Sequence, residues 1–260
     1  MATREQRLIS SRIEATDDDI ALFVARLDKF LGSNLRRLLK DLETGKASAV
    51  QAASILGSLQ SALEQAGLTD ELQQIRRMYH KQLDRVAQGF SEVADPDAIF
   101  SRADNKWLEQ MINFDEGLIA NKVYQVTDSL SSTLMRQVIT GARFDTNALV
   151  DDFGGTLANQ ITAEMNTATS GFYRSVTQAK AKELDVEYFV YVGPLDGITR
   201  PFCKSRVNKI YTRAQIAKWD NGTKLPADVY GGGYNCRHDL VPMSKERAEQ
   251  RVKEGVYSWG

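Results

Sequence analysis

The side chains best suited to chemistry lie near the C-terminus, between residues 203 and 238. Cys203, Cys236 and His238 are soft or borderline metal ligands, and zinc takes four such groups in a tetrahedral arrangement. Asp196 and Asp239 are close enough in sequence to add an oxygen ligand. The usual zinc knuckle, with two cysteines separated by two residues, is missing from this sequence. Zinc binding is therefore one hypothesis, and its alternatives are buried packing cysteines or a Cys203–Cys236 disulfide.

A catalytic use of the same side chains is a further hypothesis. A hydrolase or transferase would place Asp196, Arg200, Cys236 and His238 around a pocket, with the cysteine as nucleophile and the histidine as its base. Two residues this close in sequence seldom give that geometry, and no third residue to orient the histidine is evident. The glycine run 231–233 lacks the following Lys-Ser or Lys-Thr of a phosphate loop, so it predicts a tight turn. We therefore expect a role other than catalysis.

Proline and cysteine are unevenly distributed along the chain, which divides it into two parts. These parts must position the candidate site residues. Four of the five prolines and both cysteines follow residue 185. Proline interrupts helices and demands turns, so the two parts should differ in structure. We predict a helical domain over residues 1–184, with a sub-boundary near 91–100, and an α+β domain over residues 185–260.

Apolar residues recur every three or four positions through most of the first part, which is the spacing of a helix with one apolar face. The pattern predicts helices over 17–42, 48–67, 69–90, 101–140 and 146–184. Thr16 would cap the first helix through its hydroxyl, and Gly45 and Gly141 would end the first and the fourth. Helices of roughly 35 to 40 residues are about 50 to 60 Å long. We therefore expect an elongated helical bundle.

The second part has a different period. Residues 186–192 read V-E-Y-F-V-Y-V, a run of β-branched and aromatic residues typical of a strand covered on both faces. A short helix capped by Thr212 is predicted over 212–219, and a further strand over 237–241. The predicted fold is α+β overall and mainly α. It has an N-terminal bundle of long helices followed by a small, loop-rich α+β C-terminal domain.

Charge and hydropathy exclude several classes of protein. Lys and Arg number 33 against 34 Asp and Glu, a net charge of -1, so no global positive field attracts nucleic acid or anionic lipid. DNA contact would need a local basic patch, for which the late-chain candidates are Arg200, Lys204, Arg206 and Lys209. No run of roughly 18 to 20 apolar residues predicts a membrane span, so we expect a chain made and kept in the cytoplasm. Two cysteines do not make a disulfide framework.

The C-terminal segments follow one another in a distinctive order. A helix containing Thr162 and Glu164 and the strand 186–192 precede D-G-I-T-R-P-F-C, which starts at Asp196, and G-G-G-Y-N-C-R-H-D-L-V-P, which starts at Gly231. This order resembles the C-terminal domain of the head morphogenesis proteins of tailed phages, the Mu F-like minor head proteins. The residues that match the family motif are Asp196, Arg200, Asn235, Cys236, Arg237, His238 and Pro242.

The resemblance implies a minor structural protein of a virion, present in few copies. Such a protein associates with portal and capsid proteins, or with itself, and acts in head assembly or in DNA packaging or ejection. It would be found in the virion, and in the host cytoplasm during assembly. Two positions depart from the family pattern: His238 replaces the commoner cysteine, and Cys203 stands where a histidine is usual. Both exchanges keep a side chain that can bind a metal.

Overall fold

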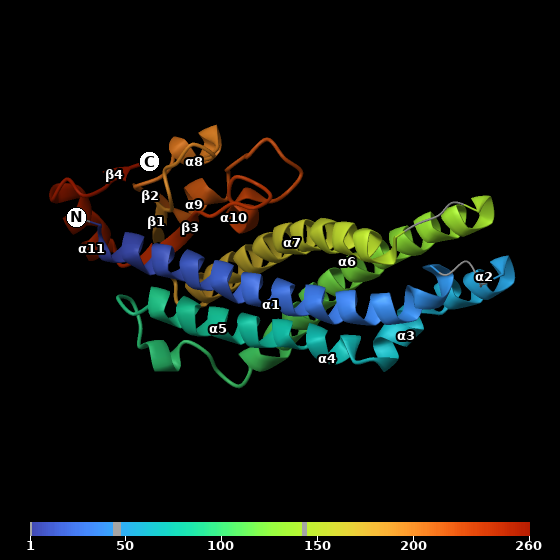
Figure 1. The fold of residues 1–260 in the computed structure, drawn as a ribbon. Coiled ribbons are helices and arrows are strands. Elements are labelled where there is room, and N and C mark those ends of the chain that lie inside the picture. Colours follow the sequence, from blue (N-terminus) through green and yellow to red (C-terminus); the bar gives the residue numbers. More distant parts are fainter. Residues whose placement is uncertain (1, 44–47, 142–144) are drawn as a thin grey trace. The chain divides into compact units, whose positions relative to one another are not determined.

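Helices occupy most of the first 184 residues in this computed structural model, which describes residues 2–43, 48–141 and 145–260 (Figure 1). The predicted mainly helical fold with a small C-terminal sheet is confirmed. The predicted stop at Gly45 lies outside the described residues. The helices of this part are α1 (Arg4–Glu43), α2 (Ala49–Gly57), α3 (Leu59–Gln65), α4 (Leu68–Leu72), α5 (Gln74–Gly89), the 3-10 helix η1 (Pro96–Ala98), α6 (Asp104–Thr140) and α7 (Thr146–Glu183).

The first helix begins well before the predicted start at residue 17. The Thr3 hydroxyl accepts a hydrogen bond from the Gln6 amide at 3.1 Å, and the Gln6 side chain accepts one from the Thr3 amide at 2.8 Å. This reciprocal pair satisfies two amides that the helix itself leaves free. Thr16 is therefore no N-cap: it is buried within α1, and its hydroxyl donates to the carbonyl of Arg12.

The other helix boundaries lie closer to the predicted positions than the start of α1 does. The predicted helix 48–67 is divided at Ser58 into α2 and α3, and Ser48 caps α2 by accepting a hydrogen bond from the Gln51 amide. The helix α6 ends at Thr140, and Gly141 follows it with a positive φ of 67°, a conformation that costs glycine little. The stop predicted at Gly141 is confirmed.

The chain divides into two compact units that do not follow sequence order. One unit contains Met1–Asp18, Met78–Ile112 and Asn166–Gly260, and the other contains Asp19–Arg77 and Asn113–Met165. The second unit is helical, and pairs such as Arg26–Glu71 and Arg76–Glu116 lie at its surface. The first unit contains the C-terminal sheet together with the start of α1 and parts of α5, α6 and α7.

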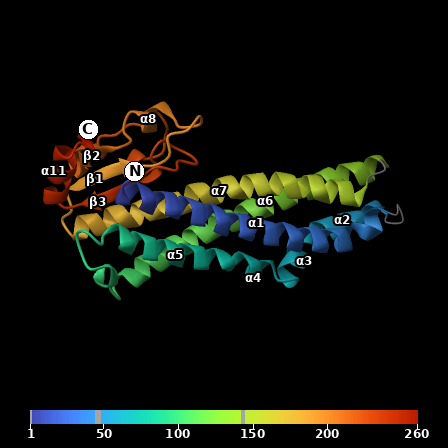
Figure 2. The same ribbon diagram turned by 60° about the vertical axis from the view of Figure 1, so that its left-hand side comes forward.

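The sheet has four strands in the order β3-β1-β2-β4, formed by β1 (Tyr188–Val192), β2 (Lys209–Thr212), β3 (Asp239–Met243) and β4 (Ser258–Trp259). The strand β1 pairs antiparallel with β2 and β3, whereas β4 pairs parallel with β2. Pro242 is tolerated in β3 because this strand is at the sheet edge. In both views the strands β1 to β3 lie beside the last turns of α7 (Figures 1 and 2).

Short helices connect these strands, and the sequence predicted one of them, the helix over 212–219, which ends earlier in the structure. The short helices are α8 (Pro201–Lys204), α9 (Arg213–Ile216), α10 (Ala227–Tyr230) and α11 (Lys245–Lys253). The predicted cap is confirmed, since Thr212 forms a reciprocal capping pair with Gln215 at the start of α9. The two predicted strands correspond to β1 and β3, while β2 and β4 were not predicted.

One buried ion pair in the first unit fixes the start of α6. The Asp104 carboxylate accepts hydrogen bonds from the backbone and hydroxyl of Ser101, from the Trp107 indole and from the Lys180 ammonium. Burial by itself raises the pKa of this carboxyl group, but these hydrogen bonds outweigh it and lower the pKa to about 2.

We expect Asp104→Asn to lower the free energy of unfolding at pH 7 by about 2 kcal/mol, since one pKa unit corresponds to about 1.4 kcal/mol. The folded-state pKa lies below the ordinary value of 3.8, so the contribution is complete above the unfolded pKa and is lost as the pH falls through about 2. Urea unfolding of both proteins from pH 7 to pH 2 measures it. A difference between them that does not shrink toward pH 2 would contradict this linkage.

Candidate functional site

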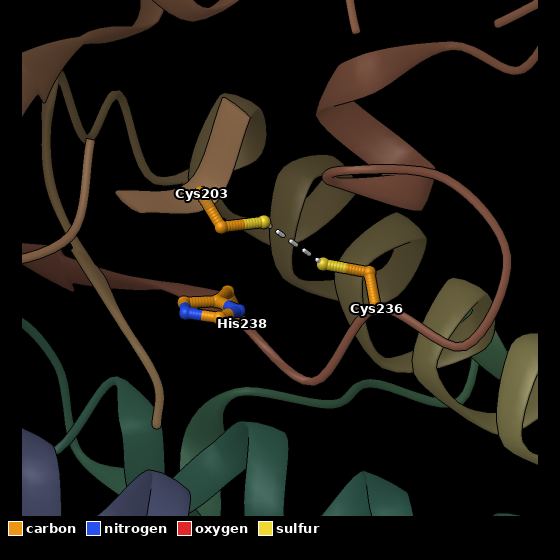
Figure 3. A group of neighbouring side chains, drawn as sticks. All are labelled: Cys203, Cys236 and His238. Carbon is orange, nitrogen blue, oxygen red and sulfur yellow. Dashed lines mark hydrogen bonds between the residues drawn. The ribbon is translucent and has the colours of Figure 1, made fainter. Parts of the chain in front are cut away.

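Cys203, Cys236 and His238 come together in the first unit. Cys203 belongs to α8, whose first position is Pro201, a residue with the backbone angle that a helix start needs. Cys236 and His238 lie in the loop before β3. The two cysteine side chains point toward each other, with their sulfur atoms 3.7 Å apart and the His238 ring beside them (Figure 3). The ligand atoms of all three residues lie within 4.8 Å of one another, a grouping that can hold a metal ion.

All three side chains are buried, with exposed fractions of 2% for Cys203, 4% for Cys236 and 3% for His238. Both cysteines are free thiols. The burial is produced partly by glycine, because backbone without a side chain can approach the three groups closely. A Cβ atom on Gly193 would lie 2.6 Å from the His238 ring, and one on Gly231 or Gly232 would lie 2.8 or 2.7 Å from the sulfur of Cys236 or Cys203.

Gly193→Ala is expected to lower the free energy of unfolding by roughly 1 to 3 kcal/mol, because overpacking forces the ring or the backbone of His238 to move. The added methyl group would also meet the His238 Cα at 2.8 Å, which a side-chain rotation cannot relieve. Gly197→Ala is the matched control, since nothing lies within 4 Å of its Cβ position. Urea unfolding of the two variants measures the effect, and equal midpoints would show that the close approach at Gly193 is unimportant.

Tyr191 completes the surroundings of the cluster from β1. Its hydroxyl lies 3.4 Å from the Cys203 sulfur and 3.7 Å from the Cys236 sulfur, and its ring stacks on His238. Burial raises the pKa of this phenol well above its ordinary value, so it stays protonated. The Gly232 amide also donates to the Cys236 sulfur at 3.2 Å. The sulfur of Cys236 therefore receives several donors.

The hydrogen bonds around the two thiols shift their pKa values in opposite directions. The pKa of Cys236 is lowered, first by the hydrogen bond from Cys203 and then by His238 and the charge of Arg174. The pKa of Cys203 is raised by the same hydrogen bond and by burial. The pair therefore favours a thiolate at Cys236 that accepts a hydrogen bond from the protonated thiol of Cys203. The thiolate is the form of cysteine that binds metals.

A buried guanidinium from α7 holds the loop that carries Cys236 and His238. Arg174 is 2% exposed and donates to the carbonyls of His238 at 2.9 Å, Val229 at 3.1 Å and Cys236 at 2.6 Å. Burial by itself lowers the pKa of Arg174, but the charge of Asp239 outweighs it and raises the pKa, so the group remains charged. The positions of both loop ligands thus depend on a helix residue far away in sequence.

Asp239 links this guanidinium to α1. Its carboxylate is fully buried and lies 3.0 Å from Arg174 Nε and 2.5 Å from Arg12 Nη2. The Arg12 guanidinium also lies over the Tyr173 ring, 4.9 Å from its centroid. Two cations thus share one buried anion. Asp239, considered above as an oxygen ligand for a metal, is engaged by arginines instead.

The remaining motif residues lie outside the cluster of ligands. Asp196 forms an exposed ion pair with Arg237, and hydrogen bonds from this arginine and from Thr199 lower the pKa of Asp196. Asn235 has a positive φ of 55°, and its amide donates to the Thr167 hydroxyl of α7. Arg200 is exposed at the start of α8. These contacts connect the loops around the cluster to one another and to α7.

The late-chain basic residues proposed for DNA contact are partly engaged within the protein. The Arg206 guanidinium lies over the rings of Phe202 and Trp219, at 3.8 and 5.3 Å from their centroids. It also donates to the Phe202 carbonyl at 3.0 Å. Arg200 and Lys204 are exposed, and Lys209 is half-buried in β2.

The sequence singled out the three ligands but not their supports, which are Tyr191, Arg174 and Arg12. Arg174 interrupts an apolar stretch that includes Phe172, Tyr173 and Val176, all of them buried. An isolated buried charge is costly, so a cation on the apolar side of a helix indicates a buried ion pair. Arg174 was the signal of this kind that the sequence contained.

No family model, curated protein or solved structure matches the chain. Among the described helices, none is both long and apolar enough to cross a membrane.

Proposed function

We propose that the chain is a minor structural protein of a tailed-phage virion, acting in head morphogenesis through association with portal and capsid proteins. The observation that carries the proposal is the burial of the motif residues Cys236 and His238 beside Cys203, held by Arg174 of a long helix. A buried motif of this kind maintains a fold, whereas catalysis requires groups that a substrate can reach. The long helices supply surface for partners in the virion, or for further copies of the chain.

We further propose that Cys203, Cys236 and His238 bind a zinc ion. Two sulfur donors and one imidazole match its preferred ligands, and the lowered pKa of Cys236 favours the thiolate that zinc requires. The ring of His238 is buried beside the two sulfur atoms, so one of its nitrogens can serve as the third ligand. Bound zinc would crosslink α8 to the loop before β3 and stabilise the C-terminal sheet region.

The alternative is a hydrolase or transferase that uses the Cys236 thiolate. Its lowered pKa is the observation in favour of this alternative. Against it stand the burial of both cysteines and of His238, and the position of Asp196 in an exposed pair with Arg237. An enzyme would lose its activity in Cys236→Ala while keeping its stability, whereas a structural core would lose stability in the same variant.

Co-expression with the portal protein of the same phage tests the virion proposal. We expect a defined complex that survives affinity purification and gives one stoichiometry in native mass spectrometry. The major capsid protein of that phage is the second bait, and an unrelated helical protein of similar size is the control. A chain that stays monomeric and is retained by neither bait would overturn the proposal.

A further inference from the structure

A second chemical site is suggested by a cavity between the start of α1 and α11 in the first unit, at the end where the N-terminus lies in Figure 1. Its volume is about 650 Å³, within the roughly 300 to 1,000 Å³ typical of ligand sites. Half of its lining residues are arginines: Arg4 and Arg7 from α1, and Arg247 and Arg251 from α11. No motif or ligand considered above involves this cavity.

Positive charges outnumber negative charges around part of the cavity. Glu92 is shared, with one oxygen 3.1 Å from Arg4 and the other 3.5 Å from Arg247. Arg7 is exposed and donates to the carbonyl of Ala2. Three guanidinium groups, those of Arg4, Arg7 and Arg247, therefore have one contacting carboxylate, which leaves about two positive charges on this side.

The charge of the fourth arginine, Arg251, is neutralised by carboxylates. Arg251 contacts the buried carboxylate of Glu5 at 3.3 Å and that of Glu254 at 3.6 Å. Glu5 also accepts a hydrogen bond from the Tyr257 hydroxyl at 2.9 Å, which helps to hold the carboxylate beside Arg251. The Nε atom of Arg251 is buried and makes no hydrogen bond among the described residues, whereas the Nε atom of Arg247 already faces Glu92 at 3.5 Å. Unsatisfied buried donors are uncommon in proteins and call for an acceptor.

We propose that this cavity binds phosphate groups. Guanidinium groups from two helices converge on one space, and phosphate offers several charged acceptor oxygens that suit the fork of donors on arginine. The same chemistry is available from the backbone of a nucleic acid and from a free nucleotide. The inference rests on the lining of the cavity alone and does not depend on the virion proposal.

The test measures binding of two probes to the full chain, a short labelled DNA duplex and dATP, over a range of salt concentrations. Arg7→Glu is the main variant, because Arg7 is exposed and its replacement should leave the fold intact. Arg37→Glu is the matched control: it makes the same charge change at an exposed position of α1, in the second unit. Equal urea midpoints would confirm that both variants fold.

We expect Arg7→Glu to weaken binding by about tenfold or more, and Arg37→Glu by less than about twofold, at low salt. Arg7-dependent binding of the duplex, with a salt dependence that decreases in the variant, would assign the phosphate to nucleic acid. If dATP binds in an Arg7-dependent way and the duplex does not bind, the natural ligand is a free nucleotide. Equal effects of the two substitutions, or no binding of either probe, would overturn the proposal.

Discussion

Asp239→Asn should lower the free energy of unfolding by about 3 to 5 kcal/mol, the cost typical of removing one partner from a buried ion pair. The substitution keeps the shape of the side chain but removes the carboxylate charge that contacts both Arg12 and Arg174. Both guanidinium groups are about 98% buried, so water cannot replace the lost charge without local unfolding. Urea unfolding at pH 7, followed by circular dichroism, gives the difference.

Asp151→Asn is the matched control for this prediction. It removes the same charge from the Arg36–Asp151 pair, whose side chains are 43% and 68% exposed, and such pairs contribute at most about 1 kcal/mol. A loss in Asp239→Asn no larger than in Asp151→Asn would show that the buried charges are compensated in another way. A second readout is the reactivity of Cys236 toward a thiol reagent, which should rise because Arg174 would no longer be held near its carbonyl.

The long helices could be predicted because a helix in a bundle repeats its apolar face over many turns. The pattern placed the ends of α6 and α7 within a few residues. It failed at the start of α1, where Glu5 and Arg12 occupy buried positions of the stripe and make the helix look polar. The short strands β2 and β4 were missed because four and two residues are too few to show a period.

The candidate site could be predicted only as far as its rare residue types allowed. Cysteine and histidine are scarce in this sequence, so Cys203, Cys236 and His238 were conspicuous without any structure. The residues that hold them are common types from distant segments, such as Arg12 from α1 and Arg174 from α7. Their convergence on Asp239 depends on how three elements pack, and no local pattern encodes that. The sequence therefore indicated a metal site as one of several hypotheses, and it did not indicate the buried ion pairs behind these residues.

Zinc removal is the second prediction with a large expected effect. The purified chain should contain one zinc per molecule by elemental analysis, and a strong chelator should lower its melting temperature. A ligand that binds only the folded state at a concentration of 1,000 times its Kd contributes about 4 kcal/mol. Because Cys203 is on α8 and the other two ligands precede β3, loss of the ion would remove the crosslink between these segments.

Single substitutions separate zinc binding from simple packing. Cys203→Ser nearly preserves the size of the side chain but replaces the sulfur donor, so it should lose zinc and become insensitive to the chelator. Tyr191→Phe is the matched control in the same cluster, since it removes the hydroxyl 3.4 Å from the Cys203 sulfur while leaving all three ligands in place. It should retain zinc. If the wild-type chain contains no zinc, and neither zinc nor chelator changes its melting temperature, the two cysteines are neutral or hydrogen-bonded core residues. The stability of this region would then depend on packing and on the buried ion pairs of Asp239.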